Sequence, residues 1–177
     1  KHLVYLRECI EHDDYDEAKR YIGIAKENIE KSYKRINTGY LPIDSLVSNA
    51  INLAETSGTK FKSDIRIEKE RITIERYDLC VALGNLLDNA IEACKKVSNA
   101  EDKNIAVSVI TTDTALVIDI ENSAERMENP NFKTTKENEI FHGYGISNVR
   151  SISEKYGGVF TIERNEASWD AVLIILI

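Results

Sequence analysis

The first 36 residues carry the apolar spacing of a helix. Apolar side chains recur three or four residues apart, at Ala18, Ile22, Ala25, Ile29, Tyr33 and Ile36. This narrow stripe is typical of a coiled-coil seam. A shorter helical segment, from about residue 2 to residue 11, precedes it, and the polar segment 12–16 offers an aspartate N-cap for the second helix. The pattern therefore predicts a helical hairpin.

A hairpin with narrow seams leaves apolar surface that needs a cover. Packing against the rest of its own chain is one way to cover it. Dimerisation into a four-helix bundle is the other. The pattern alone leaves both open.

Beyond the hairpin, turn residues divide the chain into helical and extended segments. Helices are predicted at 42–56, 77–97 and 146–156. Strands are predicted at 61–67, 71–76, 105–110, 115–120, 159–164 and 169–177, the first two as a pair and the next two as a hairpin. Strands that follow helices in this way predict an α+β fold: a two-layer α/β sandwich with helices on one face of a mixed sheet. We expect residues 1–36 to form part of a dimerising hairpin and residues 37–177 to form one domain.

Composition narrows the class of protein. The chain has 177 residues, 42% hydrophobic and 30% charged, which is typical of a folded domain, and its net charge of −7 argues against a nucleic-acid or anionic-membrane binder. The three cysteines lack C-x-x-C spacing and indicate core positions in a reducing, cytosolic context. The apolar run 171–177 is too short to cross a bilayer, which needs about 20 residues.

One candidate site lies on the predicted helix 77–97. Asn85, Asn89 and Glu92 fall on one stripe of this helix, and Asp88 lies beside them. An ordinary solvated helix face is one interpretation. The other is a Mg²⁺ site, because amide and carboxylate oxygens suit this cation, which also binds substrate phosphates.

Two further motifs carry candidate chemistry. Gly143-x-Gly145 precedes a predicted helix, whose free N–H groups can bind phosphate, although a loop that needs left-handed backbone explains the glycines equally well. Asn122 follows the predicted strand 115–120, where a side chain can read the edge of a base or simply form a turn. The polar stretch 122–142 is a long loop, which in a compact domain is usually either functional or disordered.

Together and in this order, the motifs resemble the GHKL ATPase superfamily, which includes gyrase, Hsp90, histidine kinases and MutL. Segment 84–93, Gly-Asn-Leu-Leu-Asp-Asn-Ala-Ile-Glu-Ala, is similar to the N box of that superfamily, and segment 143–149 is similar to its second glycine box. The Glu-Asn-Ser at 121–123 and the Lys-Thr-Thr-Lys at 133–136 are similar to the Agr-type, peptide-responsive sensor histidine kinases. Segment 38–44, Thr-Gly-x-x-x-Ile-Asp, fits this branch as well.

The resemblance implies roles for matching positions. Asn89 would coordinate Mg²⁺, with Asn85 supporting the metal or the phosphates as the second catalytic position. Asn122 stands where most of the superfamily has an adenine-binding Asp. ATP would also contact His142 and Ile146.

The sequence departs from the superfamily pattern at three places. Ala124 and Arg126 occupy the glycine positions of the adenine box, and Glu92 stands where familiar kinases carry a phosphate-binding Lys. Phosphate contacts are therefore expected from Lys133, Lys136 or the backbone at Gly143 and Gly145, with 123–142 as the ATP lid.

The phospho-accepting histidine is a further question. His2-Leu3 resembles the last pair of the acceptor region, which implies that the acceptor lies a few residues upstream of this chain. His2 itself is the alternative.

The resemblance thus implies the kinase core of a two-component sensor histidine kinase. It would transfer the γ-phosphoryl group of ATP to a histidine, and an Asp of a response regulator would then receive this phosphoryl group. We expect a homodimer, no nucleic-acid partner, and a cytoplasmic location below an upstream membrane sensor domain. A non-catalytic nucleotide-binding or dimerisation module is the alternative, and a gyrase-type ATPase is a third reading, weakened because Asn85 replaces its general-base Glu.

Overall fold

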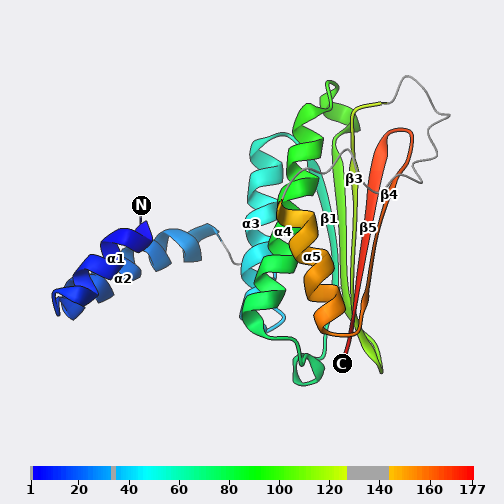
Figure 1. Ribbon diagram of the computed structural model, residues 1–177. Coiled ribbons are helices and arrows are strands. Elements are labelled where there is room, and N and C mark those ends of the chain that lie inside the picture. Colours follow the sequence, from blue (N-terminus) through cyan, green and yellow to red (C-terminus); the bar gives the residue numbers. More distant parts are fainter. Residues whose placement is uncertain (1, 33–34, 127–143) are drawn as a thin grey trace.

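The fold is taken from a computed structural model that describes residues 2–32, 35–126 and 144–177. Helices α1 (His2–Glu11) and α2 (Tyr15–Ser32) form the expected hairpin, which extends away from the rest of the molecule (Figure 1). The predicted aspartate cap is present, because the Asp14 carboxylate accepts a hydrogen bond from the backbone N–H of Glu17 at 3.2 Å. Ala18 of the seam is buried, whereas Ile22 is 52% exposed.

The remaining elements build a sandwich of helices on a sheet. The helices are α3 (Leu41–Thr56), α4 (Arg76–Lys96) and α5 (Tyr144–Lys155), with short 3-10 turns η1 (Lys69–Arg71) and η2 (Ala100–Asp102). The strands are β1 (Lys60–Arg66), β2 (Asn104–Thr111), β3 (Ala115–Ser123), β4 (Val159–Arg164) and β5 (Ser168–Leu176).

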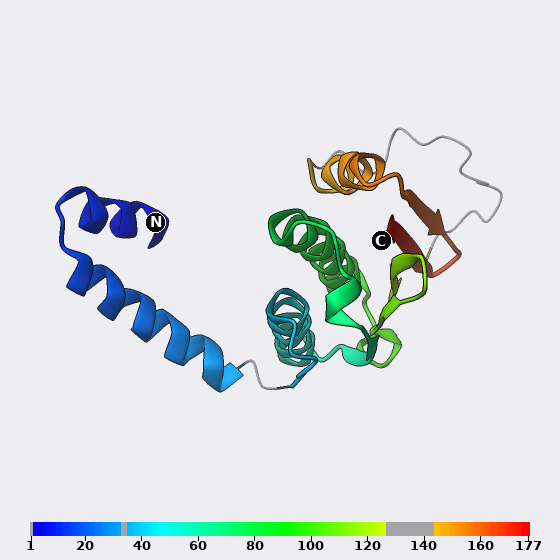
Figure 2. The ribbon, with the colours of Figure 1, turned by 90° about the horizontal axis from the view of Figure 1, so that it is seen from below.

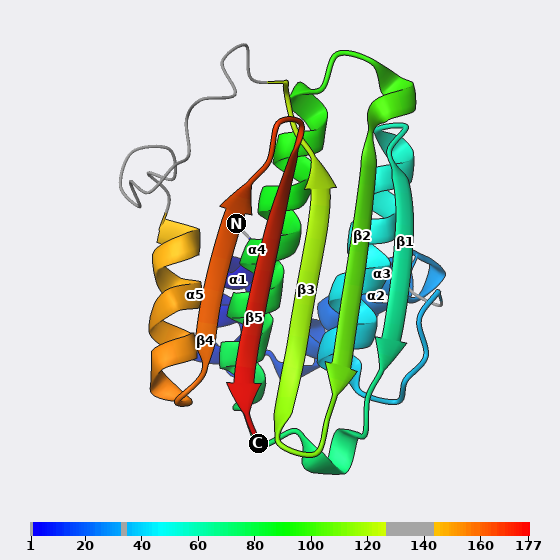
Figure 3. The same ribbon diagram turned by 90° about the vertical axis from the view of Figure 1, so that its right-hand side faces the viewer.

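The five strands form one mixed sheet in the order β1-β2-β3-β5-β4. The pair β1–β2 is parallel and the other pairs are antiparallel. Helices α3, α4 and α5 lie on one face of the sheet, as Figures 1 and 2 show from two directions. Figure 3 shows the opposite face, which none of the helices in the described ranges covers. The predicted two-layer α+β sandwich is therefore confirmed.

Side chains that are paired across neighbouring strands form rows, and these rows pack in the core. One row on the helix-covered face joins Val109, Ile118, Leu173 and Phe160, and all four are buried. Because side chains alternate between the faces of a strand, each apolar row is two residues from the next. This alternation explains why the β-branched runs of the sequence were readable as strands.

The start of α3 is tied to the segment that precedes it. The Asp44 carboxylate accepts hydrogen bonds from the Thr38 N–H at 2.9 Å, the Thr38 hydroxyl at 2.6 Å and the Gly39 N–H at 3.1 Å. Gly39 has a φ of +78°, a conformation that glycine adopts without strain. The Thr-Gly-x-x-x-Ile-Asp motif at 38–44 is therefore a structural tie.

One predicted strand is wrong. Residues 71–76 do not form a strand: they contain the end of η1, an extended connection, and the first residue of α4. The expected strand pair does not form: β1 is an edge strand, and the strand it pairs with is β2. The alternating pattern arises because Ile72 and Ile74 both turn toward the core, where Ile74 is 3% exposed.

The three cysteines are free, as expected, with Cys9 and Cys94 buried and Cys80 half-buried. Among the helices of the described ranges, none has the length and apolar character to span a bilayer.

Candidate functional site

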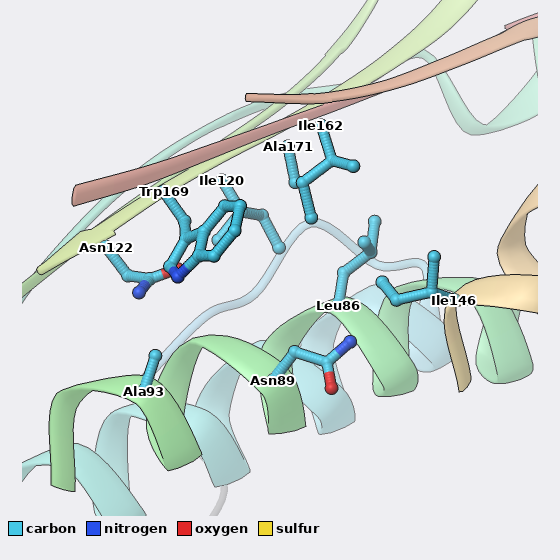
Figure 4. A pocket seen from close by; sticks show the side chains of 9 residues that line it. All are labelled: Leu86, Asn89, Ala93, Ile120, Asn122, Ile146, Ile162, Trp169 and Ala171. Carbon is cyan, nitrogen blue, oxygen red and sulfur yellow. The ribbon is translucent and has the colours of Figure 1, made fainter. Parts of the chain in front are cut away.

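A pocket lies between α4 and the sheet, at the end where β3 leaves the core (Figure 4). Its volume is about 40 Å³. It is lined mainly by apolar side chains, with two amides and one indole among them: Leu86, Asn89, Ala93, Ile120, Asn122, Ile146, Ile162, Trp169 and Ala171.

The rows of the sheet explain why the pocket forms here. Ala171 sits between Ile120 and Ile162 in its row, and its methyl group is too short to fill the space that a larger side chain would occupy. Ala93 faces this gap from α4. Two small side chains of the lining, one on the sheet and one on α4, thus contribute to the hollow.

Asn89 presents an amide to this pocket. Its Nδ2 atom is buried, and it has no hydrogen-bond partner within the described part of the chain. A buried amide without a partner costs free energy, of the order of 1–3 kcal/mol. In Figure 4 the oxygen of the amide points away from the sheet, while the nitrogen points to the side of Leu86. The side chain is therefore suited to a polar ligand.

Asn122 presents the second amide. The residue is 5% exposed, and its Nδ2 donates to the Ser123 carbonyl at 2.8 Å. This bond uses one of the two Nδ2 hydrogens, and the Oδ1 atom is the acceptor of this amide. The structure corrects one expectation: β3 continues through Ser123, so Asn122 lies within the strand rather than in a turn after it. Pairing with β2 and β5 fixes its place.

Asn85 and Gly145 meet beside the pocket. A Cβ atom on Gly145 would lie 3.0 Å from the Asn85 Oδ1 atom, which is closer than ordinary packing permits. The absence of a side chain at Gly145 on α5 thus leaves room for the Asn85 amide on α4. Here too the prediction needs correction, because α5 begins at Tyr144 and Gly145 lies in its first turn, not in a loop. The next residue, Ile146, lines the pocket.

Some predicted site residues lie outside the described part of the chain, and others lie outside the pocket. Lys133, Lys136, His142 and Gly143 lie outside the described residues, as does most of the expected lid 123–142, and the side chain of His2 is also not described. Glu92 and Asp88 are exposed and do not line the pocket.

Sequence reasoning missed one prominent wall of the site, Trp169. It lies directly opposite Asn122 across the β3–β5 pair. The register of these strands, which places the two side chains in one row, could not be read from the sequence alone.

The donor atoms fit a magnesium ion bound together with phosphate. The described residues contain no group of three His, Cys, Asp or Glu side chains that could hold a metal. Mg²⁺ does not need such a group, since it keeps waters and takes one or two protein oxygens plus substrate phosphates. The nitrogen of the Asn89 amide is buried, and the oxygen of this amide is a ligand of the kind that Mg²⁺ takes.

Comparisons with known proteins agree with this architecture. Residues 74–176 match the family model described as the GHKL domain. A probable C4-dicarboxylate sensor kinase of Bacillus subtilis (strain 168) is 28% identical over an alignment of 110 residues, and the matched residues cover 58% of this chain. They are only 20% of the relative, so the chain spans about a fifth of that protein.

Solved structures of histidine kinases share the fold. The catalytic domain of the histidine kinase ThkA superposes with a TM-score of 0.58 at 22% identity, covering 80% of this chain and 93% of that one. The Acinetobacter baumannii histidine kinase AdeS gives a TM-score of 0.55 at 12% identity, covering 99% of this chain and 95% of that one.

The family model covers more than half of the chain, and it includes every described residue of the pocket as well as the Asn85–Gly145 contact. The chain therefore belongs to the GHKL domain family.

Proposed function

We propose that this chain is the ATP-binding kinase core of a two-component sensor histidine kinase, with Mg²⁺ as the metal. The observation that carries the proposal is the juxtaposition of an apolar pocket with two amides that line it, next to the point where α5 begins against Asn85. Apolar walls with a few placed polar groups are typical of a nucleotide-base site.

In this proposal Asn122 accepts a hydrogen bond from the adenine amino group. One of its two amide hydrogens is already engaged with the Ser123 carbonyl, and its Oδ1 atom can accept from a base that presents a donor. Guanine presents a carbonyl oxygen at the corresponding position, and two acceptors repel each other. The apolar side chains of Leu86, Ile120 and Ile146 would cover the ring.

The phosphates would lie at the other end of the site. Asn89 offers its amide oxygen to Mg²⁺, which when bound neutralises charge on the phosphates. Asn85 supports the metal or the phosphates from one turn earlier on α4. The N-terminal turn of α5 adds free backbone N–H groups, and we assign further phosphate contacts to Lys133, Lys136, His142 and the backbone at Gly143 and Gly145.

We further propose where the reaction takes place. The acceptor is a histidine, upstream of this chain or at His2, and an aspartate of a response regulator receives the phosphoryl group next. The hairpin 1–36 would form a homodimer, and residues 37–177 would form the ATP-binding domain. The similarity of segments 121–123 and 133–136 to Agr-type kinases supports a cytoplasmic location beneath a membrane sensor that responds to a peptide.

Titration calorimetry with ATP, with and without Mg²⁺, tests the proposal. We expect ATP binding that is strengthened by Mg²⁺. Asn89→Ala should weaken the Mg²⁺-dependent affinity for ATP by about tenfold or more. Each factor of ten corresponds to about 1.4 kcal/mol of binding free energy.

The matched control is Asn49→Ala, a half-buried asparagine on α3 that does not line the pocket. It should bind as the wild-type chain does. Equal Mg²⁺-dependent affinity in Asn89→Ala and the wild type would refute the metal role of Asn89, and absence of ATP binding would refute the proposed function.

A further inference from the structure

The last row of the sheet carries an unusual set of side chains. Register places Asn122 of β3, Trp169 of β5 and Arg164 of β4 side by side on the helix-covered face, where the preceding rows are apolar. The guanidinium carbon of Arg164 lies 4.9 Å from the centre of the Trp169 ring, within the range of a cation–π contact. An amide and an indole that line the pocket thus share their row with a cation.

Arg164 is held in place from its other side. One of its terminal nitrogens, Nη2, donates to the Glu125 carbonyl just after β3, and the other, Nη1, is buried with no partner in the described part of the chain. Burial lowers the pKa of this guanidinium, while Glu125 acts in the opposite direction. The cation is therefore partly withdrawn from water, which strengthens its attraction to the face of the indole.

Trp169 also limits the size of the pocket. A volume of about 40 Å³ accommodates water but not a two-ring base. The indole is the largest side chain in the lining and is half-buried, and in Figure 4 it projects from the sheet toward α4 beside Asn122. Trp169 lies in the last row of the sheet, and a shift of this one ring would enlarge the pocket.

We propose that Trp169 is the residue that recognises the base: its indole closes the pocket in the free protein and swings to stack on the planar purine ring, with Arg164 supporting it. This inference rests on the proposed function, since it concerns the same nucleotide. Stacking on the Trp169 indole would select a planar base, and the Asn122 acceptor would select the hydrogen-bonding groups on the edge of that base.

The chain offers a direct probe, because Trp169 is its one tryptophan. Titration of the wild type with adenosine, and separately with ADP and Mg²⁺, should change the intrinsic fluorescence and saturate at the affinity found by calorimetry. Inorganic triphosphate should leave the emission unchanged, since it carries no base.

Two variants separate stacking from simple obstruction. Trp169→Ala should weaken adenosine and ADP binding by about tenfold, the range expected for loss of one stacked aromatic ring. Trp169→Phe should keep most of the affinity, and near-equal thermal melting of the variants would exclude misfolding as the cause.

The inference is overturned if ADP binds by calorimetry while the tryptophan emission stays constant. It is also overturned if Trp169→Ala binds as tightly as the wild type, or more tightly, which is the result expected of a mere plug. If no nucleotide binds to the wild type by calorimetry, the proposed function itself fails.

Discussion

At the scale of single residues, the contact between Gly145 and Asn85 links the two motifs of the site. The Cα of Gly145 approaches the Asn85 amide so closely that an added methyl group would meet Oδ1 at 3.0 Å and Cγ at 3.3 Å. Such distances require the neighbour to move by a few tenths of an ångström. The amide that we assign to the metal or the phosphates would therefore be displaced.

Gly145→Ala should weaken Mg²⁺-dependent ATP binding severalfold while changing stability little. The higher helix propensity of alanine should offset the cost of crowding against Asn85. Calorimetry and thermal melting measure the two effects. The matched control is Gly84→Ala on α4, where the new methyl group would meet only Leu46, at 4.0 Å. That variant should gain up to about 1 kcal/mol of stability and keep its affinity. Unchanged ATP affinity in Gly145→Ala would contradict the role assigned to this contact.

Several residues of the site were predictable and one important residue was not. Asn85 and Asn89 were conspicuous because asparagine is a mediocre helix former, and helical spacing placed them on one stripe. Asn122 and Ile146 were found through the resemblance to a family, and the structure brings both to the pocket. Trp169 belongs to the same row as Asn122 only through strand register, a long-range property that no local pattern carries.

At the scale of elements, a small network fixes α5 against α4. The Asp78 carboxylate accepts hydrogen bonds from Lys155 Nζ at 2.6 Å and from the Tyr156 hydroxyl at 2.7 Å. The same hydroxyl accepts from the Glu75 N–H at 3.1 Å. This network joins the beginning of α4 to the end of α5, and so it helps set where the opposite end of α5 meets Asn85.

The network also predicts a dependence of stability on pH. Hydrogen bonds from Lys155 and Tyr156 hold the pKa of Asp78 below its usual range. A lowered carboxyl pKa stabilises the fold above the unfolded-state value of about 3.9, and this contribution is lost as the pH falls through the folded-state value. Asp78→Asn should lower the free energy of unfolding at neutral pH by about 1–2 kcal/mol.

Urea denaturation from neutral pH down to below pH 4, compared between the wild type and Asp78→Asn, checks this expectation. The difference between the two proteins should shrink as the pH falls. Glu154→Gln, at an exposed position of α5, serves as the control and should match the wild type at neutral pH. A difference that stays constant over the whole range would show that the Asp78 charge is not responsible.

Element types were largely predictable, with one instructive error. The amphipathic helices and the β-branched strands lie where the pattern indicated, because each has one face in the core. Segment 71–76 has the same alternation for another reason: Ile72 and Ile74 anchor a connection between β1 and α4. Apolar residues at every second position indicate that alternate side chains are buried. An irregular segment at the edge of the core can show the same alternation as a strand.

At the scale of the whole molecule, the hairpin and the sandwich are joined through few described contacts. Arg35 forms an ion pair with Glu55 of α3, and the Ile36 N–H donates to the Ser48 hydroxyl at 3.3 Å. The hairpin itself exposes large apolar side chains, namely Val4, Tyr5, Ile10, Tyr15 and Ile22. A second copy of the chain would cover this surface, as the dimer proposal requires.

A chain of residues 35–177 should therefore fold, remain monomeric and bind ATP as tightly as residues 1–177, because the pocket lies entirely in the sandwich. The longer chain should be dimeric by sedimentation equilibrium, and Ile22→Glu should shift it toward monomer by burying a charge in the interface. If residues 1–177 sediment as a monomer, the hairpin does not dimerise in this chain.

The most direct test of the kinase proposal is phosphoryl transfer in the full-length protein that contains this chain. Incubation with Mg²⁺ and γ-labelled ATP should place an acid-labile, base-stable label on the protein, as expected for phosphohistidine. Asn89→Ala should abolish the label, whereas Asn49→Ala should retain it. If the full-length protein binds ATP yet acquires no such label, the chain is a nucleotide-binding module and not a histidine kinase core.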